Sequence, residues 1–256
     1  MNGAWIRSVV FLAMPLVIAT CIGIAVGGPS GMVLGILVVL GTFFLSYVHW
    51  NVYNHPRRIG LITARRRVEA LSSRRLSDRR KAARVLRGIG PNCEPILPQL
   101  LDALRDEDAL VRDHVIDAIG SMGTNAKNAV PALVAAIRSD PCVQMSAVLA
   151  LRRIGAGASK AVPVLIELLD NEDIGLRIFS ADALWRIDKR ADLAVPIMVA
   201  TLSHDSAPMR RGAAHLLGEM GAGAEGAIPS LLRARNDRDR LVRKLAADAV
   251  AKIRSE

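Results

Sequence analysis

The side chains that most often perform chemistry are few and isolated in this 256-residue sequence. Cys21, Cys93 and Cys142 stand singly, without a C-x-x-C pair, so they indicate neither a zinc site nor a disulfide framework. His114 and His215 fall at mostly polar positions of a repeated segment, as is typical of surface histidines. The sequence also contains no glycine-rich phosphate loop, nucleophile elbow or Walker-type lysine. It therefore predicts no catalytic residue, no metal ligand and no cofactor.

Arginine recurs at one position of the repeated segment, and an aspartate precedes it by four residues in three of the copies. The arginines are Arg79, Arg112, Arg177, Arg210 and Arg243, and the aspartates are Asp108, Asp173 and Asp239. Such residues pair along one helix or cap its N-terminus. We interpret Arg112, Arg177, Arg210 and Arg243 as a structural ladder between repeats, not as a ligand site. Gln144 and Met145 replace the pattern in one copy, where we expect a bend or a weak joint.

Two large aromatic side chains also depart from the repeated pattern. Where Trp185 stands, the other copies carry arginine, glycine or alanine, and where Phe179 stands, only Leu245 is strongly apolar. These rings flank Asp182, whose position is mainly charged. We interpret Phe179, Asp182 and Trp185 as a solvent-facing surface that anchors a protein partner. The alternative, that neighbouring loops cover the two rings, stays open.

The elements that position these residues are helical hairpins in a repeat. An apolar residue followed by proline recurs at spacings of 33, 32, 33 and 33 residues, at Pro98, Pro131, Pro163, Pro196 and Pro229. Eight residues before four of these prolines stands a glycine, and Asp188 replaces it once. Apolar residues at helical spacing follow each proline, then an Asp-rich turn, then a second apolar stripe rich in alanine. The pattern predicts six hairpins, of which the first is divergent.

The repeated unit resembles the short bacterial HEAT repeat. Its residues read Ala-Val-Pro-x-Leu, then Asp, then Arg-x-x-Ala-x-x-Ala-Leu and Ile-Gly, over about residues 76–256. This type of repeat is found in phycobilisome lyases and is similar to that of deoxyhypusine hydroxylase. The resemblance implies an all-α fold, a right-handed α-solenoid that binds other macromolecules. The hydroxylases hold iron with His-Glu pairs, but Val115, Asp205 and Leu216 follow His114, His204 and His215 here. That activity would therefore lack its ligands.

The N-terminal part of the sequence is apolar. Residues 8–56 contain no Asp, Glu, Lys or Arg, which excludes a wholly soluble protein. A turn-forming cluster at 27–31 divides this region into two segments of 19 residues, 8–26 and 32–50. Each segment is long enough to cross a bilayer as a helix, so the sequence predicts a transmembrane hairpin. A cleaved signal peptide over residues 1–27 is the alternative for the first segment.

The positive charge is concentrated directly after the apolar region. Residues 56–90 have a net charge of +10, equal to that of the whole chain. Positive residues beside a membrane span face the cytoplasm, which places both termini and the repeats there. We expect seven arginines to lie at a membrane surface with anionic headgroups: Arg57, Arg58, Arg65, Arg66, Arg67, Arg74 and Arg75. Nucleic acid is the alternative polyanion, although residues 91–256 have a net charge of −1.

Together these features predict three regions. Residues 1–56 form a membrane anchor, residues 57–90 a basic segment with a divergent first repeat, and residues 91–256 five HEAT-like repeats. The predicted function is that of a non-enzymatic scaffold or adaptor, anchored in the cytoplasmic membrane, that binds a protein partner. The alternatives are a lyase-like enzyme of the same repeat family, of the bilin lyase type, and a membrane tether for nucleic acid.

Overall fold

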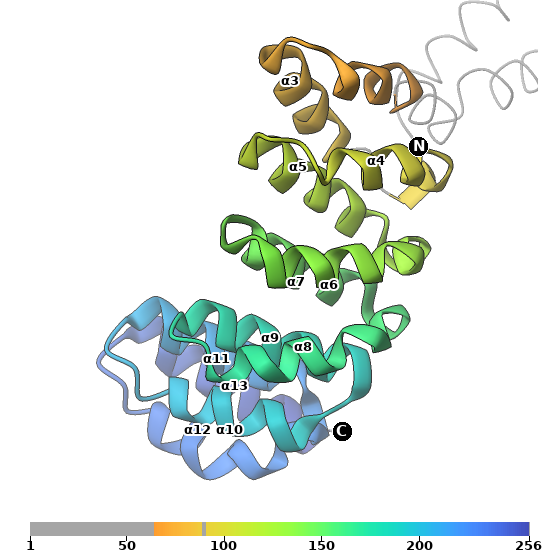
Figure 1. The fold of residues 1–256 in the computed structure, drawn as a ribbon. Coiled ribbons are helices and arrows are strands. Elements are labelled where there is room, and N and C mark those ends of the chain that lie inside the picture. Colours follow the sequence, from red (N-terminus) through yellow and green to blue (C-terminus); the bar gives the residue numbers. More distant parts are fainter. Residues whose placement is uncertain (1–63, 89–90, 256) are drawn as a thin grey trace, which may run out of the picture. The chain divides into compact units, whose positions relative to one another are not determined.

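The structure is a computed structural model that describes residues 64–88 and 91–255, and these residues contain helices and no strand (Figure 1). Residues 64–69 are helical and continue into the 3-10 segment η1 (Ala70–Ser72). The α-helices that follow are α3 (Leu76–Leu86), α4 (Leu97–Ala103), α5 (Ala109–Ser121), α6 (Val130–Ser139), α7 (Gln144–Ile154), α8 (Val162–Glu167), α9 (Ile174–Asp188), α10 (Ala191–Thr201), α11 (Ala207–Glu219), α12 (Ile228–Ala234) and α13 (Arg240–Ser255). The 3-10 segments between them are η2 (Pro91–Ile96), η3 (Gly123–Ala129), η4 (Pro141–Val143), η5 (Gly155–Ala161), η6 (Leu168–Asp170) and η7 (Gly221–Ala227).

The predicted helical repeat is confirmed in this part of the chain. Each hairpin has a first and a second helix. Four of the first helices begin with proline in the first turn, namely α4, α6, α8 and α12. Proline fits there because the first turn leaves backbone N–H groups without a helical partner. The second helices are α3, α5, α7, α9, α11 and α13. Asp108 and Asp173 cap α5 and α9, since their carboxylates accept hydrogen bonds from N–H groups of the first turn.

The glycine at the end of the second helix has a backbone role. Gly123, Gly155 and Gly221 follow their helices with φ of 59°, 66° and 54°. In the fourth hairpin Lys189 takes this role, with φ of 54°, and not Asp188 as the repeat register suggested. The 3-10 segment seen elsewhere is absent at this point of the described chain, because α10 begins at Ala191 and runs through Pro196. The fourth hairpin is therefore connected to the fifth in its own way.

The second helices form a closely packed row. Consecutive pairs α3–α5, α5–α7, α7–α9 and α11–α13 are in extensive contact. Two of these contacts depend on glycine: a Cβ on Gly120 would lie 2.8 Å from the Cα of Ala150, and one on Gly218 would lie 3.1 Å from the Cα of Ala249. The first helices instead pack on their own second helices and on neighbouring 3-10 segments. Alanine-rich second helices thus bring the repeats together and bury the core between the two rows.

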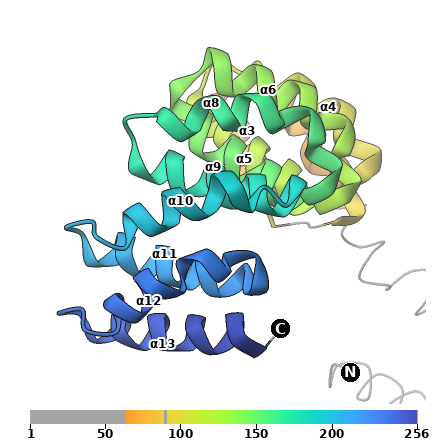
Figure 2. The same ribbon diagram turned by 90° about the horizontal axis from the view of Figure 1, so that it is seen from below.

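The row of second helices is interrupted between α9 and α11. These helices touch only slightly, and α10 packs against both (Figure 2). Trp185 stands at the position occupied by Gly120 and Gly218 in other repeats, and its indole lies over Gly223 in η7. A large ring replaces the glycine that allows close approach. The expected weak joint at Gln144 is wrong, because α7 and α9 pack closely; the loose contact is one repeat later.

The predicted membrane segments 8–26 and 32–50 lie outside the described residues, as do Arg57 and Arg58. None of the helices within residues 64–88 and 91–255 is both long enough and apolar enough to cross a bilayer.

Candidate functional site

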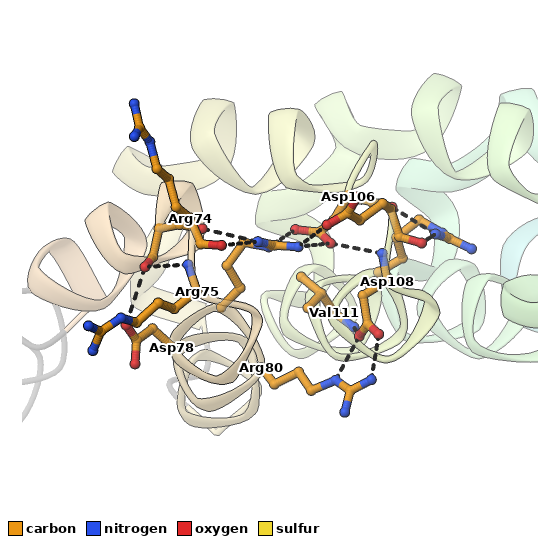
Figure 3. Close-up of polar contacts among 11 residues, drawn as sticks. Arg74, Arg75, Asp78, Arg80, Asp106, Asp108 and Val111 are labelled. Atoms are coloured by element: carbon orange, nitrogen blue, oxygen red, sulfur yellow. Dashed lines mark hydrogen bonds and ion pairs between the residues drawn. The ribbon is translucent and has the colours of Figure 1, made fainter.

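The turns between the helices of a hairpin hold an arginine–aspartate network, seen first at the joint of α3 with α5 (Figure 3). The guanidinium of Arg79 donates to the carboxylate of Asp106 at 2.7 Å, to Glu107 at 2.7 Å and to the carbonyl oxygen of Ser73 at 3.1 Å. Arg80 beside it donates to Asp108 at 2.6 and 3.1 Å. We call an arginine that binds its own turn and the next repeat's acidic residue a rung.

Two further rungs repeat this geometry. Arg112 donates to the carboxylate of Asp140 at 2.7 Å and to the carbonyl of Asp106 at 2.7 Å. Arg210 donates to both oxygens of Asp237, at 2.8 and 2.9 Å, and to the carbonyls of His204 and Asp205. Each rung therefore links one turn to the following repeat.

The aspartates that complete these rungs differ from the ones singled out in the sequence. Asp108 and Asp239 lie four residues before an arginine, but they cap their own helices and bind Arg80 and Arg211 of the preceding repeat. The rung carboxylates lie two residues before each cap, at Asp106 and Asp237. Alignment of the turns would have shown this second acidic column.

Arginine links between repeats lower the pKa of three carboxylates in the turns. The side chain of Arg80 and the backbone N–H of Val111 lower the pKa of Asp108. Hydrogen bonds from Arg210 lower the pKa of Asp237, and those from Arg211 and Val242 lower the pKa of Asp239 strongly. The charged carboxylate is favoured in each case, so these links stay formed at neutral pH.

Two of the predicted ladder arginines have no carboxylate partner within the described residues. Arg177 donates to the carbonyls of Asn171, at 2.7 Å, and Glu172, at 3.2 Å. Arg243 in α13 donates to the carbonyls of Asp237 and Arg238. Neither arginine forms an ion pair within the described residues. Each is held by its own turn alone.

Ion pairs also tie the second helices together further along. Asp117 in α5 binds Arg87 of α3 and Arg153 of α7, at 3.4 and 3.2 Å. Asp182 in α9 binds Arg152 of α7 and, at 3.0 Å, Arg186 one turn later. These contacts join neighbouring repeats across the row.

The three residues predicted to anchor a partner do not share one exposed surface. Asp182 is buried, with 2% of its surface exposed, because two arginines enclose its carboxylate. Trp185 is half-buried: its ring covers Gly223, and the Nζ of Lys189 lies 4.6 Å from the ring centroid. The expectation of an exposed trio is therefore wrong for Asp182, and Trp185 fills a joint between repeats.

Phe179 remains on the face formed by the second helices. It is half-buried and packs against the core, as do Met145 on the adjoining α7 and Leu245 on α13. Leu149 is also half-buried on α7. The residue of α11 equivalent to Phe179 is Gly212, where an added Cβ would meet no atom within 4 Å. This face thus carries half-buried apolar side chains on α7, α9 and α13, and α11 has no side chain at the equivalent position.

Two groups of arginines stand out among the described part of the basic segment, residues 57–90. Arg65, Arg66, Arg74 and Arg75 are exposed and Arg67 is half-buried. No ion pair of these five is seen within residues 64–88 and 91–255. The side chain of Arg74 extends away from the rung in Figure 3. In contrast, Arg79, Arg80 and Arg87 belong to links between repeats.

Three grooves lie between repeats of the described chain. One of about 650 Å³ lies between residues 65–72 and α4, one of about 310 Å³ lies between the α4–α5 turn, α5 and the end of α6, and one of about 440 Å³ lies between α10 and α12. The groove of about 650 Å³ is lined by both signs of charge, including Arg65, Glu69 and Asp102. Within the described residues no group of His, Cys, Asp and Glu side chains could hold a metal ion. What the described residues present is grooves and links between repeats.

The model of the HEAT repeats family matches residues 65–152, 97–185 and 162–251. The chain belongs to the HEAT repeat family. Among solved structures it is similar to an engineered protein from the Northeast Structural Genomics Consortium, with 23% identity, a TM-score of 0.56 and coverage of 75% of this chain and 96% of that one.

A second similar structure is the archaeal HEAT-like repeats protein from Thermococcus onnurineus NA1, with 17% identity, a TM-score of 0.50 and coverage of 74% and 86%. The complex of CpcE and CpcF of phycocyanin lyase from Nostoc sp. PCC7120 has 16% identity, a TM-score of 0.47 and coverage of 91% and 93%. Comparison with curated proteins gives no match. The family match establishes the fold of a HEAT-repeat array, and the two structures with TM-scores of 0.56 and 0.50 agree with it.

Proposed function

We propose that this HEAT-repeat protein is a non-enzymatic scaffold that is anchored in the cytoplasmic membrane and binds a protein partner with the face of its second helices. The observation that carries the proposal is the half-buried Phe179 on α9, with half-buried Met145 and Leu149 on the adjoining helix α7. Partly exposed large apolar side chains on one row of helices favour a protein partner, because covering them removes apolar surface from water.

The membrane part of the proposal rests on charge. Residues 8–56 contain no formal charge, and the segment that follows carries the entire net charge of the chain. Two membrane spans followed by arginines on the cytoplasmic side account for both facts. The exposed Arg65, Arg66, Arg74 and Arg75 would then attract anionic headgroups, each by about 1 kcal/mol when near the surface. Anchoring would raise the local concentration of the array near membrane-bound partners.

The partner is tested by site-specific cross-linking of the full-length protein in native membranes. A photoreactive residue replacing Phe179 is expected to give one dominant cross-linked protein, and Phe179→Ala is expected to lose that partner in a pull-down. Leu232→Ala provides the matched control, because Leu232 is 38% exposed on the first helix α12. Equal loss of the partner in both variants, with unchanged thermal unfolding, would count against the second-helix face.

The anchor is tested separately. Full-length protein should stay with the membrane after alkaline carbonate extraction and require detergent for release. Protease added outside sealed cells should leave the repeats intact. Recovery of the chain in the aqueous fraction would remove the membrane part of the proposal and leave the partner surface untouched.

A further inference from the structure

The same turn geometry recurs in six hairpins of the described chain. The first residue of each turn has a side chain that accepts a hydrogen bond from the backbone N–H two residues later, as is typical of Asx and ST turns. These residues are Ser73, Asp106, Asp140, Asn171, His204 and Asp237. In the three aspartate copies the same carboxylate also receives the arginine of the preceding repeat. The carboxylate thus serves two sets of donors at once.

The joint between α9 and α11 has the arginine without the carboxylate. Arg177 is fixed by the carbonyls of Asn171 and Glu172 through Nη1, as Arg112 and Arg210 are fixed by their own turns. No described residue accepts a hydrogen bond from the other N–H groups of the Arg177 guanidinium. By the repeat register, the residue at the position where the complete rungs have aspartate is His204.

His204 adds a donor at this position and no negative charge. Its Nδ1 accepts the backbone N–H of Ser206 at 3.0 Å, so the proton of the neutral ring is on Nε2. A second ion pair is also missing from this joint. In the last joint Arg211 binds Asp239, whereas Ile178 and Ser206 stand at these two positions here. The α9–α11 joint therefore keeps N–H donors of the rung and lacks the aspartate at the rung position. Asp205, which stands where Glu107 binds Arg79 in the first joint, forms no ion pair within the described residues.

The joint concerned is also the loosest one between second helices, since α9 and α11 touch only slightly and Trp185 replaces the glycine of a close contact. Its elements are held mainly through α10. A bridging anion would there act on two elements that otherwise have few links of their own.

We propose that Arg177 and His204 bind a carboxylate-type oxyanion that completes the missing rung between α9 and α11. The rung carboxylates show the chemistry, because their oxygens accept guanidinium N–H groups on one side and backbone N–H groups of the turn on the other. They belong to Asp106, Asp140 and Asp237. The group comes either from an acidic side chain of a docked protein or from a free anion. Only the first source rests on the proposed partner-binding function.

The test uses full-length protein in detergent micelles, with unfolding followed by intrinsic fluorescence. Sodium acetate, sodium phosphate and an acidic peptide, acetyl-Gly-Asp-Gly-Asp-Gly-amide, are titrated at constant ionic strength against sodium chloride. We expect a saturable rise in Tm of roughly 5 °C with at least one oxyanion probe, at about 100 times its Kd. Arg177→Gln should abolish the rise. Arg211→Gln, which removes a link in another joint, should retain it.

A second variant keeps the test informative if Arg177→Gln folds poorly. His204→Asp supplies the missing carboxylate from within the chain, so it should raise the Tm without added anion and eliminate the response to all probes. Saturation by the peptide at lower concentration than acetate or phosphate assigns the site to a partner's acidic side chain, and an equal or stronger response to the free anions assigns it to them.

An identical titration curve in Arg177→Gln and wild type, or an undiminished response in His204→Asp, would overturn the inference. So would the absence of any shift with all three probes. Loss of the Phe179 cross-link is measured independently, so failure of the anion site and failure of the proposed function can be told apart.

Discussion

The close approach of α5 and α7 gives a sharp prediction at Gly120. A Cβ at this residue would lie 2.8 Å from the Cα and 2.9 Å from the Cβ of Ala150. Carbon atoms in contact are normally about 3.5–4.0 Å apart, so Gly120→Ala must separate the two helices or distort them. The obstacle is backbone, which cannot rotate away as a flexible side chain would.

The expected loss follows from two opposing terms. Overpacking of this kind costs about 3 kcal/mol at the upper end of its usual range. Alanine in place of glycine inside a helix returns about 1 kcal/mol through helix propensity. The free energy of unfolding of Gly120→Ala should therefore fall by about 2 kcal/mol, which lowers the Tm by roughly 4–8 °C for a unit of this size.

Gly212→Ala is the matched control. Gly212 lies inside α11, and an added Cβ there meets no atom within 4 Å, so only the propensity term applies. Its Tm should rise by roughly 2–4 °C. Both variants are measured by differential scanning fluorimetry of the full-length protein in one detergent. If Gly120→Ala were stabilised as much as Gly212→Ala, the close packing of α5 on α7 would be refuted.

Three further predictions concern the turns and the joint at Trp185. Arg211 holds the pKa of Asp239 below its value in the unfolded chain, so this link stabilises the fold above about pH 4 and is lost as pH falls through the lower folded pKa. Asp239→Asn should therefore reduce the loss of unfolding free energy on acidification, measured by urea unfolding at several pH values. Gly223→Ala should displace the indole of Trp185, seen as a shift in its fluorescence maximum, and an unchanged spectrum would contradict the contact. Gly155→Ala should cost about 1–3 kcal/mol by chemical denaturation, because φ of 66° with ψ of −138° is a conformation that favours glycine.

Much of the fold was accessible from the sequence because each hairpin carries its own local signals. Proline can begin a helix, and glycine after the second helix permits positive φ, so Pro131 and Gly155 mark the same boundaries in the sequence and in the structure. Buried and exposed positions of the second helices also follow from helical periodicity. These signals act within a few residues, and the predicted helical repeat is confirmed where the chain is described.

The candidate surface was less predictable because burial there depends on residues about 30 positions apart. A charged column suggested that Asp182 faces solvent, yet Arg152 of the preceding repeat covers it. The looseness of the α9–α11 joint likewise follows from Trp185 meeting Gly223, a contact between repeats that periodicity does not reveal. The predicted role of Phe179 and the membrane-surface role of Arg74 and Arg75 stay predictions for the experiments above.

The short reach of the rungs has a consequence for how this architecture changes in length. Each rung arginine binds its own turn and an aspartate 27 or 28 residues later, and Arg79 also binds the adjacent Glu107. Within the described residues no rung reaches past the next repeat. Excision or duplication of one whole unit of 33 residues would bring equivalent donors and acceptors face to face again. An insertion of a few residues inside a unit would instead move one side of a rung out of reach. The molecule is built to gain or lose entire modules wherever the joined units carry both the arginine and the aspartate of a rung.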